Sequence, residues 1–514
     1  MTQLETIILL VVAAVILSAL ARRLGAPYPV FLAVGGALLA FLPGTPSFTV
    51  PPDLVLALFL APVLLDAAYD SSLRDLKDNW APVTALVLFA VALTTAAVAC
   101  VARVLLPEMP WAAAVTLGAI VAPPDAAAAT AVLRPLRVPH RILTVLEGES
   151  LLNDASALLI YRLAVGAVAT NGFSLGTVAP TFLVAVVGSV ILGPALGWLF
   201  VRLFSKIHHI PTAILLQFVT VFSVWIFADR IGLSGVLTMV CFAITMAQTM
   251  PARLPARIRV PTNAVWETVI FVLNILAFIF IGLQIRPILG TLDAAHRDRY
   301  LLIAGAVLLT VIVIRPIWHM SFNTVVRWRH RRRGYRPQRP MLRPSAGSGL
   351  VISWAGMRGI VSLAAALALP SAFPYRDLIV LSSFSVVLGT LVIQGLTLKP
   401  LLRVLNLQDN DPIGHEVVAA RGRALQAALA TIADDSSPLA SAIREEFAML
   451  LGTADGGGSG ARRSAHAMKH RAALEAARQA LLAMRTNDEI GDDAFHVMEE
   501  ELDWHEMAAG SEAE

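Results

Sequence analysis

GAIVAPPDAAAATAVL, residues 118–133, is an apolar segment with two prolines and an aspartate near its centre. Two successive prolines remove two backbone donors and disfavour helical geometry in the residue that precedes them. We therefore predict that a helix over residues 111–132 is interrupted at Pro123 and Pro124, next to Asp125. Inside a membrane, such a break is tolerated only around a protein-lined or hydrated cavity. The alternative is a simple proline kink in which Asp125 bonds to a neighbour.

The composition of the whole chain places this segment in a membrane. Of the 514 residues, 57% are hydrophobic and only 15% are charged, a balance too apolar for a soluble protein. Apolar runs of about 17 to 25 residues, long enough to cross a hydrocarbon core of about 30 Å, recur up to residue 405. We predict an all-α polytopic membrane protein with about thirteen transmembrane helices. The predicted spans cover residues 4–21, 28–43, 53–69, 80–105, 111–132, 141–168, 177–204, 210–229, 231–250, 264–287, 300–320, 349–370 and 377–405.

Basic residues predict the orientation of these spans, because Lys and Arg are retained on the cytoplasmic side of short loops. Most of them lie inside if the C-terminus is cytoplasmic, including the run RWRHRRRGYRPQRPMLR at 327–343. The net charge of +4 then belongs to loops that face anionic headgroups, and we expect no nucleic-acid partner. We predict a plasma (inner) membrane protein with an external N-terminus.

The chain changes character after residue 405. Mixed charge and amphipathic stretches, at 415–451 and 461–484, replace the apolar runs. We predict a transmembrane domain at 1–405 and a helical cytoplasmic tail at 406–514. The tail could serve regulation, dimer contact or solvation.

A second weak point lies in the predicted span 349–370, where Gly356 and Gly359 bracket Arg358. This span comes seven spans after the one that contains Asp125. Because seven is odd, the two interrupted helices run in opposite directions, as an inverted-topology repeat requires.

The densest polar cluster lies between the two breaks, in LEGESLLNDASAL at 146–158. On a helix, Glu149 lies four residues before Asn153, and Ser150 lies four residues before Asp154, so the oxygens share one side over little more than a turn. A hard monovalent cation such as sodium suits carboxylate, hydroxyl and freed carbonyl ligands. Burial disfavours the charged form of a carboxylate and a bound cation favours it, so proton and cation exclude one another at Asp154.

The buried charges also predict an ion pair. A guanidinium left unpaired in mid-membrane costs far more than one paired with a carboxylate. We therefore predict a structural pair between Glu149 and Arg358 that joins the sixth and twelfth spans.

Four blocks in order resemble the bacterial sodium/proton antiporters of the cation:proton antiporter 1 (monovalent cation:proton antiporter) family, NhaP-type branch. The resemblance covers roughly residues 5–405. It implies an antiporter fold with two crossed unwound helices, a core domain that moves against a dimerisation domain, and a homodimer. The blocks are GAIVAPPDAAAATAVL (118–133), LEGESLLNDASAL (146–158), AVWETVIFVLNILAFIFIGLQI (264–285) and WAGMRGIVSLAAALALP (354–370).

The resemblance also implies roles for individual residues. Asp154 is similar to the carboxylate that carries cation or proton, Ser150 to a cation ligand, and Asn153 and Asp125 to polar partners at the helix crossing. An Asn-Asp pair at this place resembles the electroneutral members, which implies one cation per proton.

Two positions depart from the family pattern. Pro124 replaces a common threonine, so it keeps a backbone carbonyl as a ligand but has no hydroxyl. Asp66, in FLAPVLLDAAYD at 59–70, replaces a usual glutamate and reaches less far by one methylene. For Asp66, a solvated helix end is the alternative interpretation.

The predicted function is antiport of Na⁺, or of Li⁺ or K⁺, against H⁺, with a role in pH and sodium homeostasis. A K⁺/H⁺ or broad-specificity exchanger is the alternative within transport, and a passive cation channel or an ion sensor is the alternative from another class. The sequence contains no phosphate loop, no metal-binding His cluster and no nucleophile with a base, so we expect neither an enzyme nor a cofactor.

Overall fold

The computed structural model describes residues 3–42, 51–71, 83–133, 138–169, 175–250, 253–293, 296–333, 345–407 and 412–435, with scattered residues between and beyond these ranges. Every regular element in this part of the chain is helical. The chain divides into two compact units, Met1–Asn410 and Asp411–Glu514. Most of the predicted amphipathic stretch 461–484, and residues 334–344 of the basic loop, lie outside the described residues.

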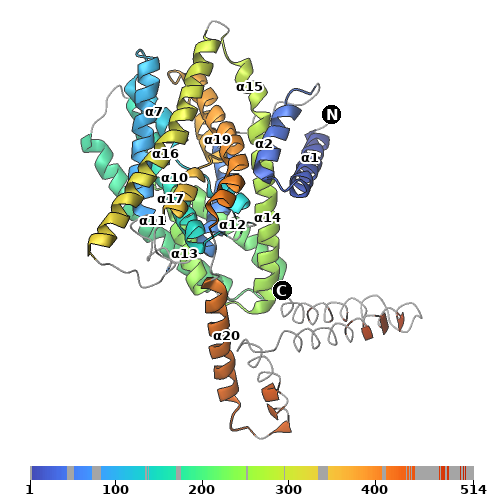
Figure 1. The fold of residues 1–514 in the computed structure, drawn as a ribbon. Helices are drawn as coiled ribbons and strands as arrows, with labels where there is room; N and C mark the ends of the chain where they lie inside the picture. The colour runs from blue at the N-terminus through green and yellow to red at the C-terminus, as the bar shows by residue number, and fades with distance from the viewer. Residues whose placement is uncertain are drawn as a thin grey trace. The chain divides into compact units, whose positions relative to one another are not determined.

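The helices of the first unit follow the order of the predicted spans (Figure 1). The N-terminal part comprises α1 (Gln3–Arg23), α2 (Tyr28–Leu39), α3 (Pro52–Val55), the π-helical η1 (Leu56–Leu60), α4 (Ala61–Asp70), the π-helical η2 (Ala85–Ala90), α7 (Val91–Leu105), α8 (Trp111–Val121), α9 (Ala126–Leu133) and α10 (His140–Ala169). The C-terminal part comprises α11 (Leu175–Phe204), α12 (Ile210–Arg230), α13 (Gly235–Thr249), α14 (Ala256–Leu283), α15 (Ile285–Gly290), α16 (Arg297–Arg333), α17 (Ala346–Trp354), α18 (Ile360–Leu367) and α19 (Arg376–Leu405).

Each predicted span coincides with a helix or with consecutive helical pieces. Within the described residues, seven helices are long and apolar enough to cross a membrane by length and composition. The remaining predicted spans correspond to shorter or interrupted helices, so the count of thirteen crossings stays a prediction.

Both predicted interruptions are present. The first separates α8, which ends at Val121, from α9, which begins at Ala126. The second separates α17, which ends at Trp354, from α18, which begins at Ile360. In each case the missing turn coincides with the Pro-Pro or Gly-Met-Arg-Gly sequence that disfavours continuous helix.

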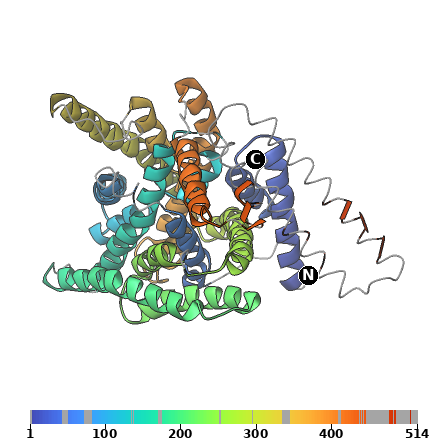
Figure 2. The same cartoon turned by 90° about the horizontal axis from the view of Figure 1, so that it is seen from below.

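The buried apolar side chains form two main clusters. The first cluster gathers residues of α7–α9, the start of α10 and α16–α19, together with α2 and the second half of α14. The second cluster gathers residues of α4, α11–α13 and the first half of α14. Seen from below, the green helices α11–α13 lie on the opposite side of the bundle from α16 (Figure 2).

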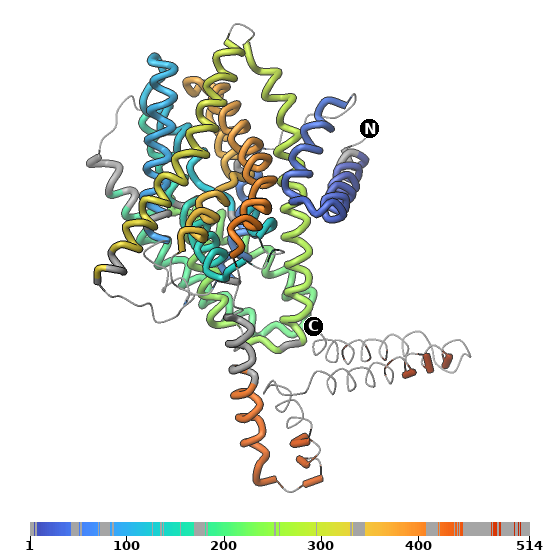
Figure 3. The backbone as a smooth tube through the Cα atoms, viewed as in Figure 1, coloured from blue at the N-terminus to red at the C-terminus, as the bar shows by residue number. Residues whose placement is uncertain are grey.

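Two long helices brace the first cluster. Helix α16 packs along α7 and α19, and its tilted path across the bundle is visible in Figure 3. Helix α10 reaches both clusters, because Ile142 belongs to the first and Leu151 to the second. The polar segment 146–158 therefore lies where the two clusters meet.

The second unit begins with α20 (Pro412–Thr431). The turn after this helix is closed by Arg444, whose guanidinium donates to the carbonyl oxygens of Ile432 and Ala433 at 3.0 and 3.1 Å.

Candidate functional site

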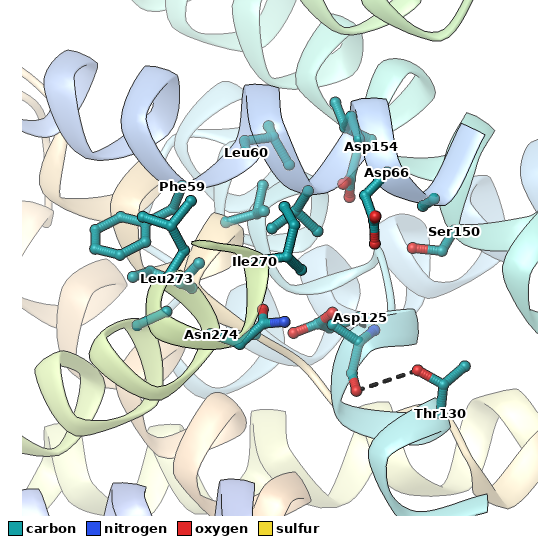
Figure 4. A pocket seen from close by; sticks show the side chains of 18 of the residues that line it. Phe59, Leu60, Asp66, Asp125, Thr130, Ser150, Asp154, Ile270, Leu273 and Asn274 are labelled. Atoms are coloured by element: carbon teal, nitrogen blue, oxygen red, sulfur yellow. Dashed lines mark hydrogen bonds between the residues drawn. The ribbon is translucent and has the colours of Figure 1, made fainter. Parts of the chain in front are cut away.

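A cavity of about 260 Å³ lies between the two clusters. Its walls come from η1 and α4, from the α8–α9 break, from α10 and α14, and from the start of α18. Figure 4 shows Asp66, Asp125, Asp154, Ser150 and Asn274 around this space. Most of its lining is apolar, so the polar groups stand out: Asp66, Asp125, Thr130, Glu147, Ser150, Asp154, Asn274 and Ser362.

The two helix breaks meet at one wall of the cavity. The backbone N–H of Asp125 donates to the carbonyl oxygen of Met357 at 2.7 Å, so each break satisfies a backbone group of the other. The Asp125 carboxylate also accepts the N–H of Ala127 at 2.9 Å. A carboxylate at that place caps the first turn of α9 and complements the positive end of the helix dipole. The predicted crossing of two unwound helices is confirmed.

Arg358 satisfies the other side of the crossing. Its Nε donates to Val121 O at 3.0 Å and its Nη2 to Ala122 O at 3.2 Å, while Nη1 donates to Gly356 O. Its backbone N–H donates to Thr390 Oγ1 at 3.0 Å. A cation at the end of α8 is favoured by the helix dipole and bonds carbonyls that the break leaves without helical partners.

The glycines beside Arg358 permit this close approach. A Cβ on Gly359 would overlap the Asp125 carboxylate, and a Cβ on Gly356 would overlap the Arg315 side chain. Any other residue at either position would push these charged groups away from the crossing.

The predicted ion pair between Glu149 and Arg358 is wrong in its partner. Glu149 instead pairs with Arg315 of α16, through a 2.6 Å contact from Nη2 to Oε2 and a second contact from Nη1 to Oε1. The two side chains are 1% and 3% exposed. The physical reason is that the carbonyls freed by the helix break already occupy the Arg358 guanidinium.

Asn153 extends this pair. Its Nδ2 donates to Glu149 Oε1 at 3.1 Å, and the side chain is fully buried. Arg315 also bonds the backbone of α17, with Nε on Ser353 O at 3.2 Å. A network of Arg315, Glu149 and Asn153 therefore ties α16, α10 and α17 together, and Asn153 is not among the residues that line the cavity.

Sequence reasoning did not identify Arg315. It lies inside the predicted span 300–320, and an ionisable residue within an apolar run is the signal that directed attention to Asp154. Applied to every span, that rule would have found it. The cavity residues Asn274 and Thr130 were also outside the predicted site, and their types are common in membrane helices for packing reasons.

The other predicted site residues line the cavity. Asp154, Ser150, Asp125, Asp66 and Pro124 all do so. Asp154 is 6% exposed and shows no hydrogen bond or ion pair to any described residue, although Asp125 acts on it electrostatically. Asp66 is half-buried and lies in the cavity wall, so the structure places it where a ligand role remains a prediction.

The site offers oxygen ligands and a negative field. Within the described residues, no group of three or more His, Cys, Asp or Glu side chains is close enough to hold a metal ion. The donors are instead spread over a cavity, with carboxylates at Asp66, Asp125 and Asp154 and a hydroxyl at Ser150. Such a set suits a monovalent cation that keeps part of its water shell, and each carboxylate can alternatively take a proton.

Comparison with known sequences identifies the family. The sequence model of the family described as "Sodium/hydrogen exchanger, transmembrane" matches residues 8–404. A Mycobacterium tuberculosis protein named as an uncharacterized Na⁺/H⁺ exchanger is 32% identical, over 98% of this chain and 96% of its own length. The sodium, potassium, lithium and rubidium/H⁺ antiporter of Bacillus subtilis is 29% identical, over 80% of this chain and 62% of its own length.

Comparison with solved structures agrees on the fold. The sodium proton antiporter MjNhaP1 from Methanocaldococcus jannaschii superposes with a TM-score of 0.61 and 17% sequence identity, over 79% of this chain and 98% of that chain. The family match extends from the first helix of the bundle to the end of α19. This chain is a multi-pass membrane protein that belongs to the sodium/hydrogen exchanger family.

Proposed function

We propose that this protein exchanges a monovalent cation, sodium in the first place, for a proton across the plasma membrane, with both ions competing for Asp154. Family membership and the names of its relatives support cation/proton antiport. We assign the exchange to Asp154 because the two buried carboxylates of α10 have different surroundings.

The two buried carboxylates of α10 differ in how their charge is compensated. Glu149 is held by a two-contact ion pair with Arg315, so its charge is compensated within the protein. Asp154 lines the cavity and has no ion pair with any residue that the structure describes. Burying an uncompensated carboxylate is costly, so it must bind either a cation or a proton, and the binding of one displaces the other.

The neighbours of Asp154 complete the proposed site. We assign Ser150 and the Pro124 backbone carbonyl as further cation ligands, and Asp125 as the group that caps α9 and adds negative field. Asp66, on α4, is proposed to reach the ion from the second cluster.

Asn153 and Glu149 hold α10 in position behind the site through Arg315.

Exchange also requires access from both sides. The cavity lies between the two hydrophobic clusters, so a displacement of one cluster relative to the other would open it alternately. We propose that the first cluster moves against the second.

We propose that the working assembly is a homodimer and that it uses no cofactor. In this proposal residues 1–405 form the exchanger and residues 406–514 form a cytoplasmic tail. The N-terminus is external.

One carboxylate that alternates between one cation and one proton carries the same charge in both directions. We therefore propose electroneutral exchange at one cation per proton. A second candidate is broad specificity that includes K⁺. It is favoured by the relative named for four alkali cations. It is also favoured by Asp66, which reaches less far by one methylene than the glutamate usual in the family.

Reconstituted liposomes that contain a pH dye test the function. Addition of Na⁺, Li⁺ or K⁺ should move protons with the wild-type chain and should need no membrane potential. Asp154→Asn keeps the shape, loses the titratable charge, and should abolish the signal. Cation flux without proton movement would support a channel and contradict antiport, and full exchange by the Asn variant would exclude Asp154 as the site.

A further inference from the structure

A second, smaller cavity of about 120 Å³ lies beside the first. It is enclosed by α4, α12, α13 and α14, all of which contribute to the second cluster. Asp66 is part of the lining of both cavities. The two cavities are therefore neighbours at this carboxylate, and the first of them also contains Asp154.

Two helices place the second cavity on the predicted cytoplasmic side of the first. On α14, the second cavity is lined between Arg259 and Glu267, while the first is lined from Ile270 to Phe278. The N-terminal end of α14 follows a loop with Arg253 that we predict to be cytoplasmic. On α4, the second cavity extends to Tyr69, closer to the helix end that leads into another predicted cytoplasmic loop.

The wall of the second cavity contains an unsatisfied hydroxyl. Thr262 is 3% exposed, and its Oγ1 has no hydrogen-bond partner within the described part of the chain. A buried hydroxyl without a partner is costly, so the Thr262 hydroxyl is available to a ligand in the cavity.

A rigid polar neighbour faces the same space. Gln217 is 5% exposed, its Oε1 accepts the indole N–H of Trp266, and its amide group contacts Met250 Sδ at 3.9 Å. The Trp266 ring stacks on Phe218, with 4.3 Å between ring centroids. The carbonyl oxygen of Gln217 is thereby held in place and keeps a second lone pair for a ligand.

The charges of this cavity favour a cation that binds weakly. Asp66 and Glu267 are acidic and Arg259 is basic, which leaves one net negative charge. A transit site must attract its ion and also release it, and a single net charge with neutral oxygen ligands meets both needs.

We propose that the second cavity is a staging site, at which a monovalent cation from the cytoplasm binds to Thr262, Gln217 and Asp66 before it reaches Asp154. This inference rests on the proposed exchange function. It assigns Thr262 and Gln217 to cation recruitment and leaves proton competition to Asp154.

Everted membrane vesicles, which expose the cytoplasmic face to the medium, allow a direct test. Proton movement is followed while Na⁺ is varied outside, which gives an apparent KM and a maximal rate for that face. Thr262→Val keeps the shape and removes the hydroxyl. Loss of one such ligand should raise the apparent KM about fivefold, with the maximal rate unchanged.

Two variants separate ligation from packing. Thr262→Ser retains the hydroxyl and should keep the wild-type KM. Thr268→Val is the matched control on the same helix, because the Thr268 hydroxyl is exposed, bonds Ala264 O at 2.9 Å and lines neither cavity. It should also keep the wild-type KM.

The staging site is overturned if Thr262→Val leaves the apparent KM unchanged. It is also overturned if Thr262→Ser and Thr268→Val raise the apparent KM as much as Thr262→Val does. Absence of cation-dependent proton movement in the wild type would contradict the proposed function instead. The two failures are thus distinguishable in one data set.

Discussion

Glu149 and Asp154 are both buried carboxylates on α10, but their surroundings differ. Glu149 accepts two contacts from Arg315 and one from Asn153, and is 1% exposed. Asp154 faces the cavity and has no such partner within the described residues. The first carboxylate is therefore suited to hold helices together, and the second to bind an exchangeable ion.

The Glu149–Arg315 pair yields a prediction about stability. Glu149→Gln leaves a buried guanidinium uncompensated and should lower the free energy of unfolding by about 3 to 5 kcal/mol. Arg315→Gln should cost a similar amount. In the double variant neither charge remains, so the combined loss should be clearly smaller than the sum of the two single losses. Denaturant unfolding of the purified variants in detergent measures all three, and strict additivity would contradict a direct pair.

At this scale the sequence predicted which residue types matter better than it predicted their partners. Glu149, Ser150, Asn153 and Asp154 were recognisable because polar groups within an apolar helix need a reason. The partner of Glu149 was not recognisable. The choice between Arg315 and Arg358 depends on which carbonyls the helix breaks release, and that follows only from the tertiary crossing.

The crossing of the α8–α9 and α17–α18 breaks is the central arrangement at the scale of elements. Asp125 complements the start of α9, and Arg358 complements the end of α8, so each helix end meets the opposite charge. The N–H of Asp125 and the carbonyl of Met357 join the two breaks at 2.7 Å. This arrangement, together with the Arg358 guanidinium, satisfies several backbone groups of the unwound segments at membrane depth.

Gly359 provides a test of the crossing. Gly359→Ala places a methyl group against the Asp125 carboxylate and should reduce exchange about tenfold or more, because small displacements of a positioned group cost rates of that order. Gly166→Ala is the matched control on α10, since a Cβ there meets no described atom within 4 Å. It should exchange at the wild-type rate. Equal behaviour of the two variants in the liposome assay would contradict the proposed importance of the close approach.

Arg358 provides a second test. Arg358→Lys keeps the charge but cannot span three carbonyls, so it should leave about two acceptors unsatisfied at roughly 1 to 3 kcal/mol each. Arg376→Lys is the comparison, because Arg376 also bonds two carbonyls, Leu367 O and Leu369 O, but in a half-buried place where water can substitute. The melting temperature should fall much more for Arg358→Lys. A larger fall for Arg376→Lys would show that the crossing does not depend on the guanidinium.

Both breaks were predictable from sequence, because Pro-Pro and closely spaced glycines act locally on backbone geometry. The exact number of crossings was less accessible. Helices α2, α8 and α13 are short for a membrane span, and their roles depend on neighbours that a hydropathy window does not see.

For the whole molecule, the two hydrophobic clusters with a polar cavity between them are the basis of the proposed alternating access. Among the described residues, neither cluster contains a side chain of the second unit, Asp411–Glu514. We therefore predict that removal of residues 411–514 leaves cation/proton exchange in liposomes within about twofold of wild type, although the pH of half-maximal activity can shift. Complete loss of exchange by a folded, truncated protein would assign the tail an essential part in transport.

In the proposed cycle, one cation displaces one proton at Asp154. Calorimetric titration of the purified protein with Na⁺, repeated in buffers of different ionisation enthalpy, counts the protons released for each cation bound. The wild type should release one proton per Na⁺ at a pH where Asp154 is protonated, and Asp154→Asn should neither bind with comparable affinity nor release a proton. Na⁺ binding without proton release in the wild type, or the same release from the Asn variant, would contradict competition at this carboxylate.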